Sequence, residues 1–449
     1  MNCYRVAFIS LGCAKNLVNT EQMMALVQDA GHIIVEDPAE ADVAVVNTCA
    51  FIDAAKSEAI DNILQLAQLK TTGFLKKIIV TGCLSQRYQK EILEEMPEVD
   101  GILGTGSYDQ IVPAIEQVMQ DELAMYLGNI NHTEEEGARI VTTPDYMAYL
   151  KIAEGCSNWC AFCVIPSLRG RYRSRPMESL LEEARGLAEA GVKELIVIAQ
   201  DITRYGTDWD GKHHLAQLLR ELCKIDGFHW IRLHYLYPDD FDDELIDTIA
   251  EEPKILPYLD IPIQHCNDRI LSVMNRRGTK QEILDLFATL RKRIPGLVLR
   301  TSLICGLPGE GDAEFEELCD FLKEVKIERA GVFQYSAEEG TPAAEMDNQV
   351  PSEIAARRVE LVVELQSRIM DEFNESRLGE VLEVLCEGYN PEMECFRGRT
   401  YADSPDIDGH VYFTAAEDIP AGSFVPILIT GTTDDGDLMG EINDSAEEE

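Results

Sequence analysis

Short apolar stretches alternate with helix-like stretches along most of this chain. The first three apolar stretches are RVAFIS (5–10), ADVAVVNT (41–48) and KKIIVTG (76–82), and amphipathic segments such as EQMMALVQDAG separate them. Strands buried in a parallel sheet are short runs of apolar and β-branched residues, whereas amphipathic helices repeat every 3.6 residues. The pattern predicts an N-terminal parallel α/β domain over residues 4–120, followed by a polar connector over 121–145.

A second alternating series predicts a central domain over residues 142–372. It contains six candidate strands, at 148–154, 194–201, 230–236, 258–265, 297–306 and 329–337. Six βα units can close most of a barrel or form an open, doubly wound sheet, and the periodicity alone allows both. One long amphipathic helix (352–379) follows. Short strands with turn residues then predict a small all-β barrel over residues 375–443.

The composition is that of a globular protein with an acidic surface. Hydrophobic residues make up 45% of the chain, and the 81 acidic and 39 basic side chains give a net charge of −42. Such a field repels phosphate backbones and attracts basic partners, although it also serves solubility. Because no apolar run approaches the length of a membrane span and the N-terminus lacks a secretory signal, we expect a soluble cytoplasmic protein without a membrane partner.

The thirteen cysteines are too many and too scattered for a small disulfide scaffold, and thiols stay reduced in the cytoplasm. Three of them, Cys13, Cys49 and Cys83, each follow a predicted strand, in SLGC, NTC and TGC. Ligands of open parallel sheets bind just beyond the carboxyl ends of the strands. We therefore expect these three thiols to converge on one metal site, rather than to be independent small residues at turns.

A second set of three cysteines is local. The run C-x3-C-x2-C at Cys156, Cys160 and Cys163 directly follows the first strand of the central series. Thiolates suit zinc or an iron–sulfur cluster, but structural zinc sites complete four ligands, and no fourth Cys or His follows closely. A four-iron cluster with three thiolates leaves one iron open for a substrate or cofactor.

The segments that carry these cysteines resemble the radical S-adenosylmethionine methylthiotransferase family over nearly the whole chain. The C-x3-C-x2-C run with Phe162 before its last cysteine is similar to the signature of radical S-adenosylmethionine enzymes. TSLICGLPGE (301–310) looks like the glycine-containing segment that lies against the bound cofactor in that superfamily. The resemblance is completed by SLGCAKN, NTCAFIDAA, TGCLSQRY and the terminal β module.

The resemblance implies a partial (β/α)6 barrel in the centre, a C-terminal barrel of the TRAM type, and two 4Fe–4S clusters. The radical-generating cluster would be held by Cys156, Cys160 and Cys163, with S-adenosylmethionine on its open iron near Gly306 and Gly309. An auxiliary cluster that carries the sulfur would be held by Cys13, Cys49 and Cys83. One S-adenosylmethionine would methylate the sulfur, and another, reduced by an electron donor, would yield the radical that opens an unactivated C–H bond.

Two branches of that family compete as the identity of the substrate. One modifies an adenosine of transfer RNA, and the other modifies an aspartate of the small-subunit ribosomal protein twelve. IPIQH (261–265), SLGCAKN and YADSPDIDGHVY (401–412) resemble the second branch. From Glu375 onward there are 19 acidic residues and only three arginines, which suits a basic ribosomal protein, so direct RNA binding is not expected.

Several polar residues near the predicted site have either a functional or a structural role. Arginines gather in RGRYRSRP (169–176). A structural role, in which this segment enters a helix and its arginines pair with acidic residues, is favoured over contact with a cofactor or substrate. For Gln200, Asp201, His265, Lys15 and Asn16 a structural role is also favoured. A non-enzymatic alternative, an iron–sulfur carrier or electron-transfer protein, explains six ligands but not the six βα units or GLPGE.

Overall fold

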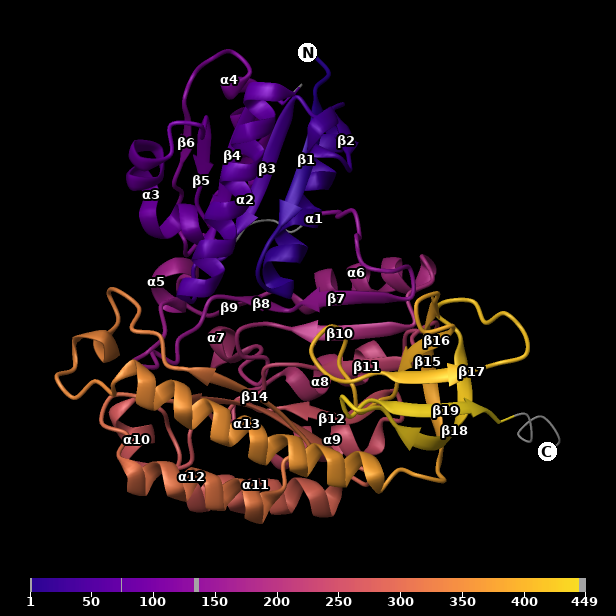
Figure 1. The fold of residues 1–449 in the computed structure, drawn as a ribbon. Helices are drawn as coiled ribbons and strands as arrows, with labels where there is room; N and C mark the ends of the chain where they lie inside the picture. Colours follow the sequence, from indigo (N-terminus) through magenta and orange to yellow (C-terminus); the bar gives the residue numbers. More distant parts are fainter. Residues whose placement is uncertain (1, 74, 133–136, 444–449) are drawn as a thin grey trace.

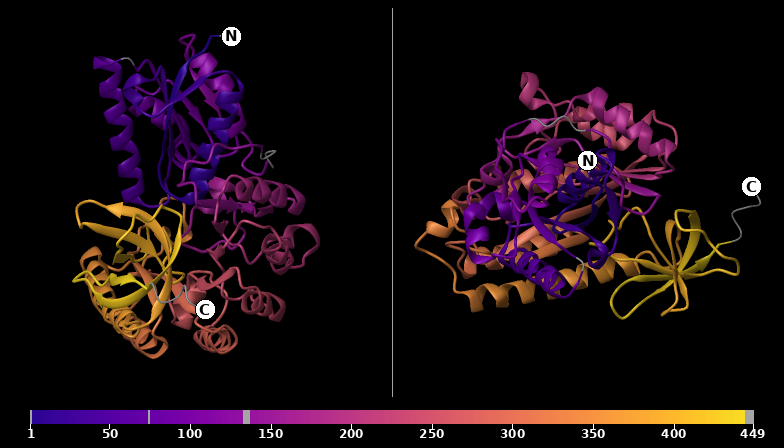
Figure 2. Two further views of the ribbon diagram at one scale, coloured as in Figure 1. Left: turned by 90° about the vertical axis from the view of Figure 1, so that its right-hand side faces the viewer. Right: turned by 90° about the horizontal axis from the view of Figure 1, so that it is seen from above.

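The computed structural model of the chain describes residues 2–73, 75–132 and 137–443. Three parts follow one another in Figure 1: an N-terminal α/β domain, a central half-open barrel below it, and a C-terminal β-barrel beside the central part. Figure 2 shows that the C-terminal barrel projects to one side, at the end of the long helix α13 (Ser352–Glu375). Within the described part of the chain, no helix is long and apolar enough to cross a membrane.

The N-terminal domain is a six-stranded parallel sheet in the order β2-β1-β3-β4-β5-β6. Its strands are β1 (Arg5–Ser10), β2 (Ile33–Val35), β3 (Val43–Thr48), β4 (Lys77–Gly82), β5 (Gly101–Leu103) and β6 (Ala124–Tyr126). Helices α1 (Ala14–Asp29) and α4 (Ile111–Val118) pack on one face, and α2 (Asp53–Thr72) and α3 (Cys83–Glu95) on the other. The order reverses between β1 and β3, which places a topological switch point there.

The sheet extends past residue 120, where a polar connector was predicted. The short edge strand β6 pairs with β5, and only the segment after it connects the two domains. Three residues are too few to show a strand period in the sequence.

The central domain confirms the six predicted strands and decides how they are arranged. All are parallel, in the order β14-β13-β12-β11-β10-β7. This order never reverses, so the sheet is a half-open barrel rather than a doubly wound sheet. The strands are β7 (Met147–Lys151), β10 (Glu194–Ile198), β11 (Trp230–Leu233), β12 (Ile255–Asp260), β13 (Val298–Cys305) and β14 (Arg329–Gln334).

Helices cover the outer face of this barrel. They are α6 (Met177–Glu189), α8 (Leu215–Cys223), α9 (Asp243–Glu251), α11 (Lys280–Arg293) and α12 (Asp312–Val325). The connections also contain a short ribbon, β8 (Ala153–Glu154) with β9 (Arg173–Ser174), and the short helices α5 (Ile165–Arg169), α7 (Thr207–Asp210) and α10 (Asp268–Val273). Of these, α5 packs on the N-terminal domain, where Leu168 joins the core.

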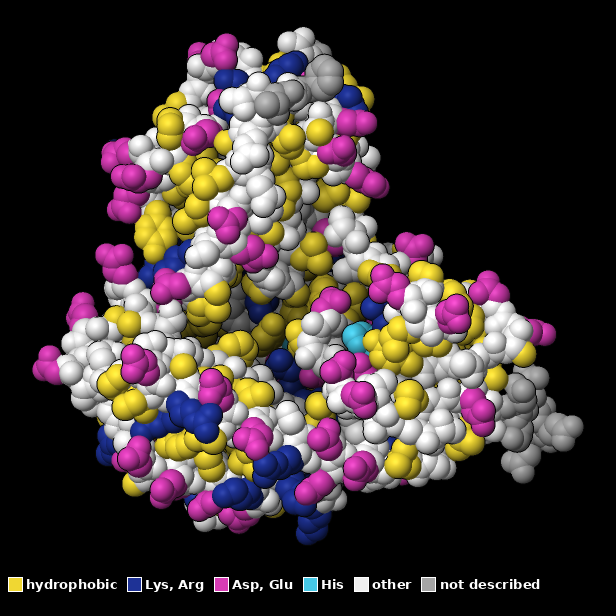
Figure 3. All heavy atoms as spheres, in the orientation of Figure 1, with side chains coloured by type: hydrophobic (Ala, Val, Ile, Leu, Met, Phe, Trp, Pro, Cys, Tyr) yellow, Lys and Arg dark blue, Asp and Glu magenta, His cyan; other side chains and the backbone are white. Residues whose placement is uncertain are grey.

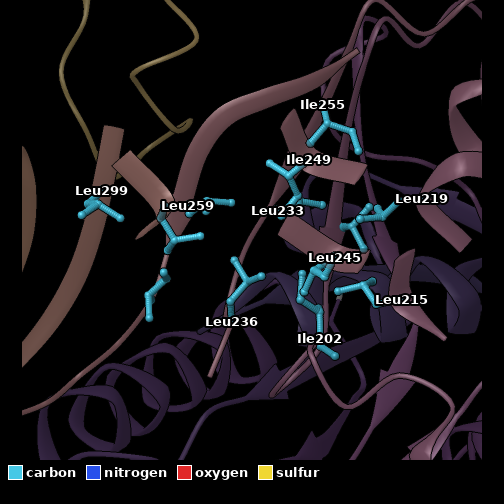
Figure 4. Close-up of a cluster of buried hydrophobic side chains, with 14 of the residues drawn as sticks. Ile202, Leu215, Leu219, Leu233, Leu236, Leu245, Ile249, Ile255, Leu259 and Leu299 are labelled. Carbon is cyan, nitrogen blue, oxygen red and sulfur yellow. The ribbon is translucent and has the colours of Figure 1, made fainter. Parts of the chain in front are cut away.

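Alternate side chains of the barrel strands face two different environments. Leu233, Leu259 and Leu299 belong to the apolar core between the strands and helices such as α8 and α9, as Figure 4 shows. Their neighbours on the same strands include Arg232 and Tyr258, which are fully buried on the inner face. The inner face of the barrel is therefore partly charged and needs polar partners.

The C-terminal domain supplies those partners. It is a closed barrel in the order β15-β16-β17-β19-β18, made of β15 (Val381–Asn390), β16 (Cys395–Arg399), β17 (Val411–Thr414), β18 (Phe424–Thr432) and β19 (Leu438–Ile442). Its segment 400–408 makes polar contacts with inner-face residues of the central barrel. Asp403 pairs with Arg329 at 2.8 Å, and the Ser404 hydroxyl lies 2.9 Å from His234 Nε2.

Glu194 anchors this contact between the two barrels. It is completely buried and binds two arginines, Arg232 at 2.8 Å and Arg399 of the C-terminal barrel at 2.6 Å. Both guanidinium groups hold the pKa of Glu194 below its usual value against the effect of burial. The carboxylate is therefore ionised and shared between the domains.

Replacing Glu194 by glutamine should lower the free energy of unfolding by about 3–5 kcal/mol, because two buried guanidinium groups lose a common counter-charge. Urea denaturation followed by circular dichroism measures this loss. Glu383→Gln is the matched control, since its half-exposed carboxylate pairs with His229 at the same interface and should cost at most about 1 kcal/mol. Equal losses in the two variants would contradict the anchoring role.

Candidate functional site

The first group of cysteines lies beyond the carboxyl ends of three adjacent strands. Cys49 and Cys83 directly follow β3 and β4, and Cys13 comes three residues after β1. β1 and β3 flank the switch point of the sheet, where the connections leave in opposite directions and open a crevice. The structure therefore brings together the three thiols that lie far apart in the sequence.

Two glycines make this convergence possible. A Cβ on Gly12 would lie 2.6 Å from Cys49 Cβ, and a Cβ on Gly82 would lie 2.6 Å from the Thr48 carbonyl oxygen. Both glycines have a positive φ, +91° and +95°, which side chains rarely tolerate. The glycine before the cysteine in SLGC and TGC thus allows neighbouring loops to touch.

Buried amides fix the same strand ends. Asn16 donates its Nδ2 hydrogens to the carbonyls of Leu11 and Thr48, at 2.9 and 3.0 Å. Asn47 donates to the Asn16 carbonyl at 2.8 Å. Asn16 therefore has a structural role, joining the loop after β1 to the end of β3.

The three thiols are close enough to influence one another's ionisation. Burial raises the pKa of Cys49 to about 11, with further contributions from Cys83 and Cys13. Burial also raises the pKa of Cys83. At Cys13 burial acts in the same direction, but the neighbouring Lys15 and Arg169 charges outweigh it and lower the pKa. Three thiolates are thus stable together only with a positively charged group among them, as metal ligands are.

The second group of cysteines lies in the loop between β8 and α5. The backbone N–H of Cys163 donates to the Cys160 carbonyl at 3.0 Å, and that of Cys156 donates to the Gly170 carbonyl at 3.1 Å. Burial raises the pKa of Cys156 to about 11, with Cys160 contributing, and it raises the pKa of Cys163 still more strongly. These thiols too need a positive partner to ionise.

Both groups consist of three thiols, which are the usual ligands of iron–sulfur clusters. In a four-iron cluster each thiolate binds a different iron, so three thiols leave the fourth iron open for a cofactor or substrate. Within residues 2–73, 75–132 and 137–443, no three His, Cys, Asp or Glu side chains are placed to bind one metal ion.

Gln200 and Asp201 hold the second cysteine loop in place. Gln200 donates to Glu154 at 2.9 Å, just before Cys156. Asp201 accepts a hydrogen bond of 2.8 Å from Asn158, between Cys156 and Cys160. These strand-end residues therefore position the loop, in agreement with the structural role favoured for them.

Packing accounts for the glycines of the GLPGE turn. Gly306 and Gly309 have φ of +84° and +82°, and a Cβ on Gly306 would lie 2.3 Å from Ala355 Cβ of α13. Glu310 closes the turn by accepting a 3.0 Å hydrogen bond from the Gly306 N–H. His265 lies 3.6 Å from Glu310, and burial lowers its pKa to about 4, so its ring is neutral. Contact of these glycines with S-adenosylmethionine stays a prediction.

Three positively charged residues near the thiols were not singled out as functional from the sequence. Arg276 donates to Cys160 Sγ at 3.5 Å, and Arg169 is buried beside the first group. The Lys15 ammonium lies 3.5 Å from the centroid of the Tyr235 ring. The other arginines of RGRYRSRP fit the predicted structural role: Arg175 pairs with Glu183 at 2.7 Å, and Arg171 is exposed.

A hollow separates the N-terminal domain from the central barrel. Figure 3 shows it on the face seen in Figure 1, with Lys or Arg side chains visible inside and a histidine to its right. The outer surface around it carries many acidic side chains. The acidic outer surface complements a basic partner, and the basic hollow complements a small anionic group on that partner.

Comparison with known proteins places all three parts of the chain. Residues 5–104 match the model of the uncharacterized protein family UPF0004, residues 150–322 that of the radical SAM superfamily, and residues 378–442 that of the TRAM domain. A radical S-adenosylmethionine methyltransferase, TsrM from Kitasatospora setae, solved with cobalamin and a 4Fe–4S cluster bound, shares the fold. Its TM-score is 0.55 at 15% identity, covering 76% of this chain and 77% of that one.

Curated relatives are similar over nearly their whole length. The ribosomal protein uS12 methylthiotransferase RimO of Lachnoclostridium phytofermentans is 48% identical, covering 97% of this chain and 99% of that protein. The enzyme of the same name from Clostridioides difficile is 46% identical, covering 98% of each. The chain therefore belongs to the RimO family of radical S-adenosylmethionine methylthiotransferases.

Proposed function

We propose that this protein adds a methylthio group to the β-carbon of an aspartate in ribosomal protein uS12. The observation that carries the proposal is the convergence of Cys13, Cys49 and Cys83 on one sheet edge, which faces a barrel bearing its own group of three cysteines. The two groups would hold one 4Fe–4S cluster each. S-adenosylmethionine, bound at the second group and reduced by an electron donor, would supply the radical that removes hydrogen from the unactivated carbon.

The chain's own residues would prepare the two groups for this chemistry. Lys15 and Arg169 place positive charge beside Cys13 and stabilise its thiolate. Asp201 and Gln200 fix the loop of the second group through Asn158 and Glu154. Both sets of contacts come from the chain's own side chains, which would hold the ligand residues in place.

The charges of the C-terminal barrel favour a basic protein substrate over transfer RNA. Its three arginines all pair with acids: Arg377 with Glu380, and Arg397 and Arg399 with Glu387. Acidic side chains thus leave this barrel with little positive charge to bind phosphates. We infer that the protein acts in the cytoplasm, where ribosomal proteins are made and assembled.

Mass spectrometry of uS12 and of bulk transfer RNA from a strain that lacks this protein tests the proposal. The methylthio group should disappear from uS12, while the methylthiolated adenosines of transfer RNA remain. Loss from transfer RNA alone would assign the protein to the other branch of the family. Loss from neither would favour an iron–sulfur carrier.

A further inference from the structure

Arg169 connects the two cysteine groups physically. It ends α5, six residues after Cys163, yet its guanidinium lies in the N-terminal domain and only 2% of the residue is exposed. One of its nitrogens donates to Asn16 Oδ1, on α1. A side chain from α5, the helix that follows the second cysteine loop, therefore reaches the edge where the first group gathers.

The charge of Arg169 lies next to the first group. Asn16, which accepts a hydrogen bond from Arg169, donates its own hydrogens to the carbonyls of Leu11 and Thr48, in the segments that carry Cys13 and Cys49. Glu154 accepts a hydrogen bond of 2.8 Å from Arg169 and holds it in place. Glu154 in turn is fixed by Lys151 at 3.2 Å. Arg169 is therefore a buried cation beside the first group of thiols.

Arg276 occupies the corresponding position at the second group. It is 8% exposed, donates to Cys160 Sγ at 3.5 Å, and donates to the Pro262 carbonyl at 2.6 Å. Its guanidinium lies 4.6 Å from the centroid of the Tyr237 ring. Each group of thiols thus has one buried guanidinium beside it. Hydrogen bonds to neighbouring side chains or carbonyls hold each guanidinium in place.

We propose that Arg169 and Arg276 are positioning residues that set the reduction potentials of the two clusters separately, Arg169 for the auxiliary cluster and Arg276 for the radical-generating cluster. A reduced cluster carries one more negative charge than an oxidised one, so a nearby buried cation stabilises the reduced form and raises the potential. This inference rests on the proposed function for the identity of the two clusters.

The test measures each potential without interference from the other cluster. In a full-length chain with Cys156, Cys160 and Cys163 replaced by alanine, the auxiliary cluster gives the only iron–sulfur signal in electron paramagnetic resonance. In that background Arg169→Gln should shift the midpoint potential to a more negative value, and Arg276→Gln should leave it unchanged. In the complementary background Cys13, Cys49 and Cys83 are replaced by alanine. There Arg276→Gln should shift the midpoint potential to a more negative value, and Arg169→Gln should leave it unchanged.

Two further variants separate an electrostatic effect from a packing defect. Arg169→Lys keeps the charge but loses the forked geometry, so it should restore most of the potential. Glu154→Gln removes the negative charge that partly neutralises Arg169, so the potential should move in the positive direction. A packing defect would not produce shifts of opposite sign. Arg175→Lys is the control for a buried arginine of the same segment, which pairs with Glu183.

Iron content distinguishes failure of this inference from failure of the proposed function. If either background binds no iron, the cluster assignment itself is wrong. If both clusters assemble but Arg169→Gln and Arg276→Gln shift neither potential, or shift both equally, the separate roles of the two arginines are overturned. A positive shift for Arg169→Gln would overturn the electrostatic argument as well.

Discussion

A variant in which Cys156, Cys160 and Cys163 are replaced by alanine should release no 5′-deoxyadenosine from S-adenosylmethionine under anaerobic reducing conditions. The three thiols lie in one loop, and the proposed cluster there is the only place where the cofactor would receive an electron. Iron content should fall from about eight to about four per chain, because the first group is untouched. Liquid chromatography of the reaction and iron analysis of the same sample measure both results.

Cys223→Ala is the matched control, since this cysteine ends α8 and its strongest charged neighbours are Glu252 and Lys254 rather than other thiols. It should retain full cleavage and full iron. Release of 5′-deoxyadenosine by the triple variant at the rate of the control would show that the second group is not the site of cleavage.

The strands of this protein could be predicted because each is a short apolar run between helical segments. All six strands of the central barrel lie within or overlap their predicted ranges. The apolar runs do not reveal the order of the strands in the sheet. Whether six βα units close or reverse depends on which strands pair, and strand pairing leaves no period in the sequence. The alternation in WIRLHYL did indicate that one face of this strand is polar, because Arg232 and His234 share one face of β11 and its extension.

The convergence of Cys13, Cys49 and Cys83 could be predicted for a topological reason. Carboxyl ends of parallel strands meet at one edge, so three cysteines within three residues of neighbouring strand ends must come near one another. The domain boundaries and the ligand roles of the cysteines stay predictions, since neither the fold nor the relatives' names identify ligands.

Arg169 and Arg276 show what could not be predicted. An arginine side chain reaches far from its backbone, and Asn16, which accepts a hydrogen bond from Arg169, lies 153 positions earlier in the sequence. In RGRYRSRP the four arginines look equivalent, yet only the first is directed to the cysteines, because the backbone turns at Gly170, where φ is +74°. The sequence shows basic residues close to a cysteine loop, but it does not show which of the four arginines is directed to the cysteines.

A variant in which Cys13, Cys49 and Cys83 are replaced by alanine should still cleave S-adenosylmethionine but should transfer no methylthio group to uS12. The second group keeps its own supports, Asp201 through Asn158 and Arg276 at Cys160, and neither contact involves the first group. Cleavage and transfer should therefore separate, with about four irons per chain remaining. Mass spectrometry of a uS12 peptide, together with assay of 5′-deoxyadenosine in the same reaction, measures this separation.

Cys3→Ala is the control for this variant, because Cys3 belongs to the same domain but is exposed and precedes β1. It should retain both activities. Methylthiolated peptide from the triple variant would mean that sulfur reaches the substrate without the first group, and the crevice at the switch point would then have another purpose. Loss of cleavage together with transfer, in a folded triple variant that keeps four irons, would mean instead that the first group is needed for the reductive step itself.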